Sequence, residues 1–246
     1  MVVASTVAMR RATAEQRVAA LDWGAAAAAL DAFGAAILPG LLSAAECRAI
    51  AALYAKPEHF RSHIIMARHG FGRGEYRYFA YPLPAPIGAL RGALYSCLAP
   101  IANAWSARMG AGARYPATHA QFLKACHAAG QTRPTPLLLK YVAGDYNCLH
   151  QDLYGELAFP LQATVLLSAP GEEFTGGEFV LTEQRPRMQS RAEVVCLQRG
   201  DAVAFAVSNR PMRGSKGDYR VMLRHGVSRV RTGQRHTLGI IFHDAA

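Results

Sequence analysis

The chain has 246 residues, of which 51% are hydrophobic and 18% are charged. This composition is typical of a globular protein with a sizeable core, and it excludes an intrinsically disordered chain. The formal net charge is +10, and because no apolar run is long enough to span a bilayer, we expect no membrane partner.

The N-terminal part of the chain carries helix-start signals. Capping-box patterns at Thr13 and Ser43 predict an Ala-rich helical stretch over 13–34 and a helix over 43–54. Asp22 can restart the first stretch as a second helix, because Asp is a favoured N-cap residue.

The middle of the chain first loses and then regains this pattern. Residues 60–86 are rich in Gly, Pro, Arg and aromatic residues, and they predict irregular structure. Helical patterns return over 87–109 and 117–129, and a Pro-containing break follows at 131–136.

After residue 136 the pattern changes to short apolar or alternating runs separated by Gly-rich turns. These runs cover residues 137–142, 159–168, 178–182, 192–197, 202–207, 219–225 and 237–242. Several short strands at such spacing predict an all-β sandwich or barrel, against which the helical half packs as one unit.

The strand region contains residues that suit a metal centre. His150 and Asp152 are two residues apart, so they share one face of an extended segment, and His225 ends a later strand. Two histidines and one carboxylate leave coordination positions open, as in non-haem Fe(II) oxygenases, although the same residues also suit zinc. Arg235 could grip a cosubstrate carboxylate bidentately, and the hydroxyl of Thr237 could share that face.

The chain order of these five residues, preceded by Tyr141, resembles that of the Fe(II)/2-oxoglutarate-dependent dioxygenases. The segments 176–181 and 199–205 are similar to strands of prolyl-hydroxylase-like members. The resemblance implies an α+β fold with a double-stranded β-helix barrel of the jelly-roll or cupin-like type. In this fold residues 137–246 form the catalytic core, and residues 1–136 form an N-terminal helical support in one integrated domain.

The resemblance also implies roles for single residues. His150, Asp152 and His225 would be the Fe(II) ligands, and 2-oxoglutarate and O2 would be the cosubstrates. Arg235 would bind the distal carboxylate of 2-oxoglutarate, and Tyr141 would donate a hydrogen bond to it, unless Tyr141 is only a core residue. A second family tyrosine is replaced here by Leu166, so the far end of the pocket differs.

More narrowly, the segments 150–156, 159–162 and 225–229 are similar to a prokaryotic group described as oxygenases acting on damaged DNA. This similarity implies hydroxylation of a C–H bond and favours oxidative demethylation of alkylated nucleic acid. The alternatives are a hydroxylase of a protein side chain or small metabolite, and a non-catalytic metal-binding barrel that senses 2-oxoglutarate.

The charge distribution bears on the partner. Residues 185–235 hold twelve Lys and Arg residues against three Asp and Glu residues, which indicates a polyanionic partner such as nucleic acid. An Arg-rich, Lys-poor composition explains the same strip without a partner. Arg73 and Tyr76, in a Gly-rich segment with interleaved cations and aromatics, and Arg187, in a predicted loop, are candidate substrate-binding residues.

Two features predict the compartment. The five cysteines are scattered without a C-x-x-C pair, which disfavours a disulfide scaffold. The segment after Arg10 and Arg11 lacks the apolar stretch of a signal peptide. We therefore expect a cytoplasmic protein.

Overall fold

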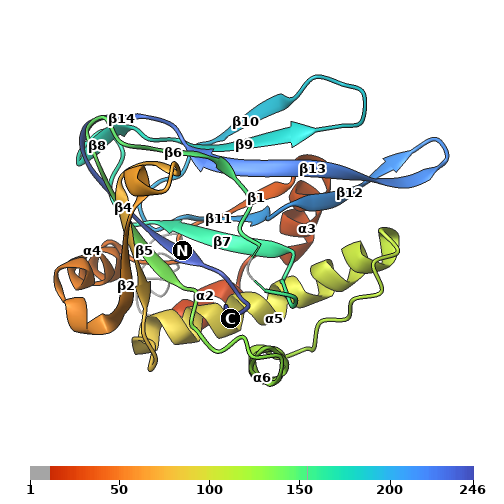
Figure 1. Ribbon diagram of the computed structural model, residues 1–246, viewed down its shortest axis with the longest axis horizontal. Coiled ribbons are helices and arrows are strands. Elements are labelled where there is room, and N and C mark those ends of the chain that lie inside the picture. The colour runs from red at the N-terminus through yellow and green to blue at the C-terminus, as the bar shows by residue number, and fades with distance from the viewer. Residues whose placement is uncertain (1–11, 154) are drawn as a thin grey trace, which may run out of the picture.

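The computed structural model describes residues 12–153 and 155–246 as helices packed against two antiparallel β-sheets (Figure 1). Arg10, Arg11 and Tyr154 lie outside the described residues. The helices are α2 (Ala14–Ala19), α3 (Trp23–Phe33), α4 (Ala44–Ala52), α5 (Ala85–Arg108) and α6 (His119–Ala128), with 3-10 turns η1 (Leu53–Ala55), η2 (Pro57–His59) and η3 (Met66–Arg68). The strands are β1 (Ala35–Leu38), β2 (Phe60–Ile65), β3 (Gly72–Arg73), β4 (Glu75–Phe79), β5 (Leu137–Val142), β6 (Tyr146–His150), β7 (Leu161–Leu166), β8 (Phe174–Gly176), β9 (Phe179–Gln184), β10 (Arg191–Val195), β11 (Ala202–Ala206), β12 (Asn209–Gly214), β13 (Gly217–Val227) and β14 (Val230–Ile240).

The predicted N-terminal caps are confirmed. The Thr13 hydroxyl accepts from the Gln16 backbone at 3.3 Å, and the Gln16 side chain accepts from the Thr13 backbone at 2.9 Å. Ser43 and Glu46 form the same reciprocal box at the start of α4. The Asp22 carboxylate caps α3, so the Ala-rich stretch is two helices rather than one.

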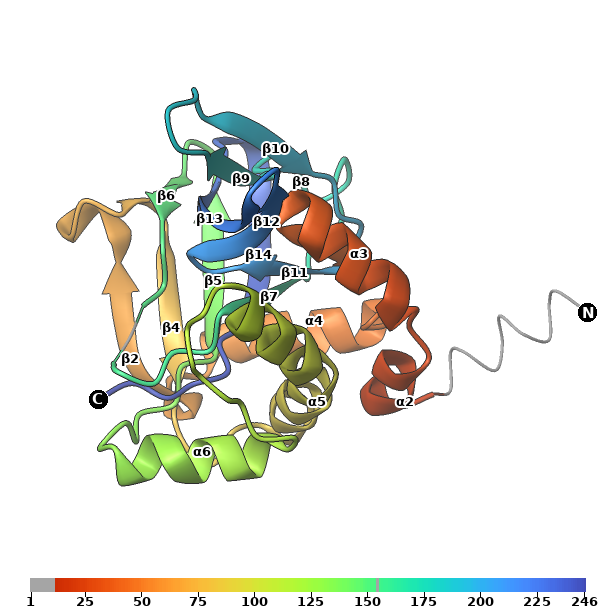
Figure 2. The same cartoon turned by 90° about the vertical axis from the view of Figure 1, so that its right-hand side faces the viewer.

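The strands form two sheets. The larger has the order β1-β11-β7-β14-β5-β4-β2 with β8 beside β14, and the smaller has the order β10-β9-β13-β6-β3 with β12 beside β13. In Figures 1 and 2, β9, β10 and β13 lie above β7 and β11, and α5 lies beneath them. Within the described ranges no strand of one sheet pairs with a strand of the other, so the predicted barrel is two layered sheets rather than a closed cylinder.

The prediction of irregular structure over 60–86 is wrong for much of that segment. It contains β2, β3 and β4, and β4 extends the larger sheet by pairing with β5, with Tyr76 opposite Leu139. Strand β4 was hidden because Glu75, Tyr76, Arg77 and Tyr78 are all half-buried, which blurs the alternation of polar and apolar positions.

Helix α5 is held to the larger sheet by a buried arginine. Arg91 is 1% exposed; it pairs with Asp244 at 2.9 Å and donates to the carbonyls of Ile241, Phe242 and His243. These contacts attach the chain segment that follows β14 to helix α5.

None of the described helices combines the length and apolarity needed to cross a bilayer.

Candidate active site

Two paired strands bring the two predicted histidine ligands together. His225 of β13 stands directly opposite His150 of β6, and the ring centroids are 4.2 Å apart. Gly226 permits this approach, because a Cβ atom there would lie 2.7 Å from the carbonyl oxygen of Asn147. The pairing places two imidazoles side by side although 74 positions separate them in the chain.

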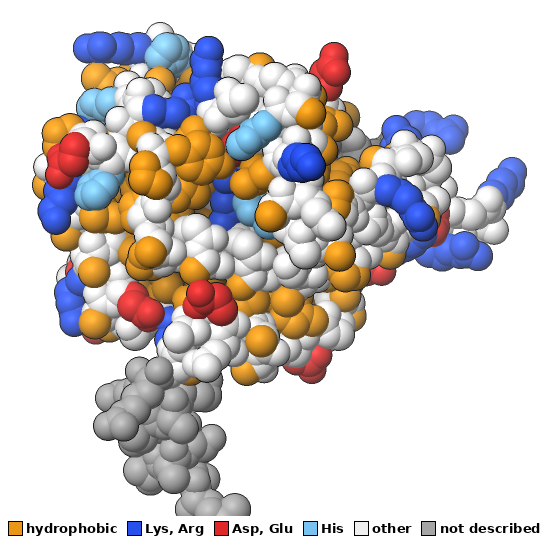
Figure 3. Space-filling view, turned by 90° about the horizontal axis from the view of Figure 1, so that it is seen from below, with side chains coloured by type: hydrophobic (Ala, Val, Ile, Leu, Met, Phe, Trp, Pro, Cys, Tyr) orange, Lys and Arg blue, Asp and Glu red, His pale blue; other side chains and the backbone are white. Residues whose placement is uncertain are grey.

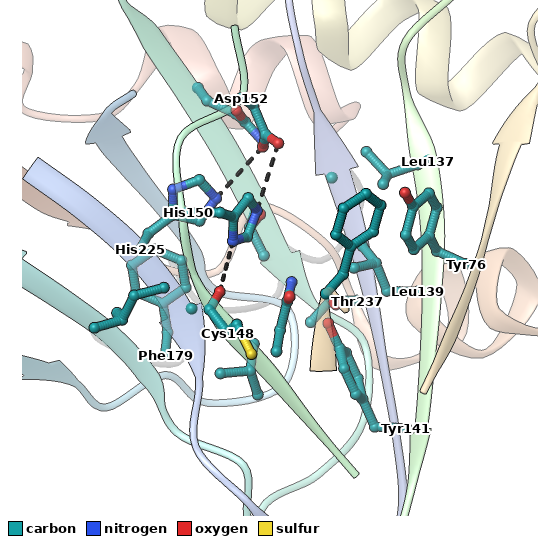
Figure 4. A pocket seen from close by; sticks show the side chains of 18 of the residues that line it. Tyr76, Leu137, Leu139, Tyr141, Cys148, His150, Asp152, Phe179, His225 and Thr237 are labelled. Carbon is teal, nitrogen blue, oxygen red and sulfur yellow. Dashed lines mark hydrogen bonds and ion pairs between the residues drawn. The ribbon is translucent and has the colours of Figure 1, made fainter. Parts of the chain in front are cut away.

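Asp152 completes the group from the segment after β6. Its two carboxylate oxygens lie 3.4 Å from Nε2 of His150 and 3.4 Å from Nε2 of His225 (Figure 4). The three side chains can offer ligand atoms that all lie within 4.8 Å of one another. Burial raises the pKa of Asp152, but contacts with both histidines lower it more, so its pKa stays well below the ordinary value.

The surroundings orient both imidazoles. Nδ1 of His150 donates to the Cys148 carbonyl at 2.8 Å, which leaves Nε2 as the lone-pair atom that faces Asp152. The ring of His225 stacks on Phe179 at 5.9 Å and contacts Phe205 at 4.6 Å. Burial lowers the pKa of His225, which favours the neutral imidazole that binds metals.

Arg235 lies in the same cavity as a buried cation. It is 2% exposed, and no carboxylate within the described part of the chain forms an ion pair with it. Its Nε atom is buried without a hydrogen-bond partner, and its Nη1 atom lies 3.5 Å from the Thr237 hydroxyl. Burial lowers the pKa of Arg235 to about 10. Burying an unpaired charge is costly, so this arrangement fits an anion that binds from the cavity.

Neighbouring residues make room for that cation. Gly177 has φ +66°, and a Cβ atom there would lie 3.0 Å from Cδ of Arg235. The ring of Tyr141 lies 5.6 Å from the guanidinium, and the Tyr141 side chain is fully buried. Burial raises the pKa of Tyr141, so its hydroxyl stays protonated and able to donate a hydrogen bond.

One cavity of about 390 Å³ collects these groups. Its walls include all six predicted metal and cosubstrate residues and also Tyr76. The other two predicted substrate residues do not line it: Arg73 is exposed on β3, and Arg187 is exposed in the loop between β9 and β10. The sequence analysis missed Leu137, Leu139 and Gln162 as lining residues. The alternation of residues along each strand shows which side chains share a face of the sheet, but it does not show which of the two faces lines a cavity.

Comparison with known proteins identifies the family. Residues 74–245 match a family described as oxygenases that catalyse oxidative methylation of damaged DNA. The chain belongs to this oxygenase family. Over 168 residues the oxygenase is 51% identical to two uncharacterized proteins from two strains of Mycobacterium tuberculosis, a match that covers 68% of this chain and 72% of each relative.

Solved structures show the fold of the oxygenase. A prolyl-4-hydroxylase from Pseudomonas putida gives a TM-score of 0.52 at 15% identity, covering 91% of this chain and all of that one. A 2-oxoglutarate-Fe(II) oxygenase from Burkholderia pseudomallei gives 0.54 at 17% identity, covering 92% and 93%. A prolyl hydroxylase from Trichoplax adhaerens gives 0.55 at 13% identity, covering 90% and 89%. The predicted fold is confirmed, and the His-Asp-His group together with these findings supports Fe(II), 2-oxoglutarate and O2 as cofactor and cosubstrates.

Proposed function

We propose that this oxygenase uses Fe(II), 2-oxoglutarate and O2 to hydroxylate an N-methyl group in alkylated nucleic acid, and thereby removes it. In this proposal His150, Asp152 and His225 bind the metal. The observation that carries the proposal is the unpaired, buried Arg235 in the same cavity as this group. A purely structural metal site does not require a buried, unpaired arginine in the same cavity, whereas a site that binds an anionic cosubstrate does.

The residues divide the work in a simple way. The neutral Nε2 atoms and the Asp152 carboxylate hold the metal on one wall, and Arg235 binds the distal carboxylate of 2-oxoglutarate on the other, assisted by Thr237. The buried Tyr141 hydroxyl donates a hydrogen bond to the same cosubstrate. Fe(II) bound there supplies the redox chemistry that couples O2 to the decarboxylation of 2-oxoglutarate.

The overall reaction balances. One oxygen atom of O2 enters succinate as CO2 leaves 2-oxoglutarate, and the other enters a C–H bond of the methyl group. The resulting hydroxymethyl group leaves its nitrogen as formaldehyde, and a proton replaces it on the base. Oxygen insertion into a methyl group therefore leads to demethylation of the base.

Exposed cations support nucleic acid as the partner. The strip 185–235 is not one continuous face, because Arg210 is buried against Glu183 and Arg235 lines the cavity. Most of the exposed remainder lies on two hairpins, β9–β10 and β12–β13, which project from one end of the molecule (Figure 1), whereas the exposed Arg229 and Arg231 lie at the start of β14. Figure 3 shows Lys and Arg side chains at that end.

We also propose a cytoplasmic location, which suits the five free cysteines of the described residues.

The test is turnover of a methylated oligonucleotide with Fe(II), 2-oxoglutarate and O2. We expect succinate and formaldehyde in equal amounts from the methylated strand, and neither product above background from the unmethylated strand. His225→Ala should abolish both products, whereas His63→Ala, at an exposed histidine on β2, should retain them. Succinate release that no oligonucleotide stimulates would point to a protein or metabolite substrate, and 2-oxoglutarate binding without any turnover would point to a sensor.

A further inference from the structure

The three side chains of the candidate metal group are placed by different kinds of structure. His150 and His225 lie on the paired strands β6 and β13, and β6 ends at the pair that these two residues form. Asp152 lies two residues beyond this end, in a segment without regular secondary structure. Backbone pairing therefore fixes the two imidazoles, but it does not extend to the carboxylate.

The side chain of Gln151 forms a bond where this pairing stops. If the register of β6 and β13 continued, Asp152 would stand opposite Leu223. The Leu223 carbonyl instead accepts a hydrogen bond from Nε2 of Gln151 at 2.7 Å. Because a carbonyl can only accept, the nitrogen of the amide must face it, so the orientation of this amide is fixed. One side chain thus links the residue before Asp152 to the strand that carries His225.

The contacts between Asp152 and the two histidines cannot replace this link when a metal is bound. They join the carboxylate oxygens to Nε2 of His150 and to Nε2 of His225, each at 3.4 Å (Figure 4). These nitrogen atoms face the centre of the group and would bind the metal, so metal binding removes both contacts. The position of the carboxylate then depends on the chain next to it, and Gln151 ties that chain to β13.

We propose that Gln151 is a positioning residue, which holds Asp152 where its carboxylate binds the metal together with His150 and His225. This inference rests on the proposed function, in which these three residues bind Fe(II). Without the Gln151 bond the segment adopts other arrangements, and the metal affinity falls in proportion to the fraction of molecules that keep the binding arrangement. Residues that orient metal ligands typically change metal affinity by about 10- to 100-fold.

The test is anaerobic calorimetry of Fe(II) binding to the metal-free protein. Gln151→Met keeps the length of the side chain but removes the donor, and we expect the Kd for Fe(II) to rise about 10- to 100-fold. Gln151→Asn keeps an amide but is shorter by one carbon–carbon bond, about 1.5 Å, so it should show a loss in the same direction. This second variant decides the question if the Met variant does not fold.

The matched control is Gln184→Met. Gln184 is exposed on β9, and its Nε2 atom also donates to a backbone carbonyl, that of Arg185, at 3.0 Å. The control therefore removes the same kind of bond at a place away from the metal group, and it should leave the Kd for Fe(II) unchanged. An equal loss in Gln184→Met would show that the effect is not specific to Gln151 and would overturn the inference.

The dependence of turnover on Fe(II) separates positioning from a structural or chemical role. Because all three ligands remain in Gln151→Met, saturating Fe(II) should restore its succinate formation towards the wild-type rate. His225→Ala lacks a ligand and should stay inactive at every Fe(II) concentration. A wild-type Kd for Fe(II) in Gln151→Met, or turnover that saturating Fe(II) does not restore, would overturn the inference alone. If the wild-type protein binds no Fe(II), the proposed function fails, and the inference fails with it.

Discussion

At the scale of single residues, Arg235 is the most informative side chain. A guanidinium that is buried without a paired acid is unfavourable, and burial is the cause that lowers its pKa to about 10. The fold keeps this charge because Gly177 leaves space for its stem and Tyr141 covers one side. We expect the unfavourable energy to be recovered when a carboxylate binds.

Substitution of Arg235 should therefore affect the cosubstrate before anything else. Arg235→Lys keeps the charge but cannot form a bidentate hydrogen bond to a carboxylate, so we expect the KM for 2-oxoglutarate to rise about tenfold or more. Arg235→Gln should raise it further. Steady-state kinetics with varied 2-oxoglutarate provides the measurement, and Arg231→Gln, at an exposed arginine of the same strand, serves as the control. An unchanged KM in Arg235→Gln would remove Arg235 from the cosubstrate site.

At the scale of elements, β13 links the candidate site to the surface that we assign to nucleic acid. The strand carries His225 near one end and begins at Gly217 in the turn of the projecting hairpin. These two residues are about 27 Å apart along an extended strand. Arg108, at the end of α5, pairs with Asp218 at 2.9 Å and with Asp31 of α3 at 2.8 Å. The hairpin is thus tied to two helices.

The hairpin cations should control affinity for nucleic acid. Combined replacement of Arg187 and Arg213 by Gln should weaken DNA binding and reduce the slope of log Kd against log salt by about 2, since each phosphate contact contributes about 0.9. Fluorescence anisotropy across a salt series measures both quantities. Replacement of the exposed Arg48 and Lys124, on the helical side, should leave the slope unchanged. If both double replacements reduced the salt slope equally, DNA binding would depend on the net charge of the protein and not on the hairpin arginines.

At the scale of the whole molecule, the segment after β14 joins the helical layer to the larger sheet. His119 of α6 lies 2.8 Å from the Phe242 carbonyl, and the ring Nδ1 of His243 accepts from the Phe159 backbone at 3.2 Å. Burial and the nearby Arg91 lower the pKa of each of these two histidines to about 4. Both therefore stay neutral in the folded protein at pH values where they are protonated in the unfolded chain.

This shift predicts acid sensitivity. The stability contributed by the neutral rings is complete above pH 6.5 and declines as the pH falls towards 4, because the unfolded chain binds protons that the folded chain excludes. We expect the free energy of unfolding to fall by about 2 kcal/mol per histidine between pH 7 and pH 5. Urea unfolding at both pH values measures the loss, and His119→Gln should make it smaller. An identical loss in His119→Gln would contradict the assignment to His119.

The candidate metal site could be predicted from the sequence because its ligands follow local rules. His150 and Asp152 are two positions apart on one extended segment, and the order in which His225 and Arg235 follow them in the chain resembles that of the dioxygenase family. Gln162 could not be found in this way. Its strand 161–166 is buried at five of six positions, so periodicity does not distinguish a glutamine that faces a cavity from one packed in the core.

The sequence by itself determined the types of most elements, the β-rich second half and the residues that suit a metal and a carboxylate, because capping, strand periodicity and residue chemistry act locally. Only the tertiary structure decided that β2 and β4 extend the larger sheet, that Arg73 and Arg187 stay outside the cavity, and that Gln162 lines it. The physical reason is that strand register joins residues far apart in the chain, and this register selects the neighbours of each side chain.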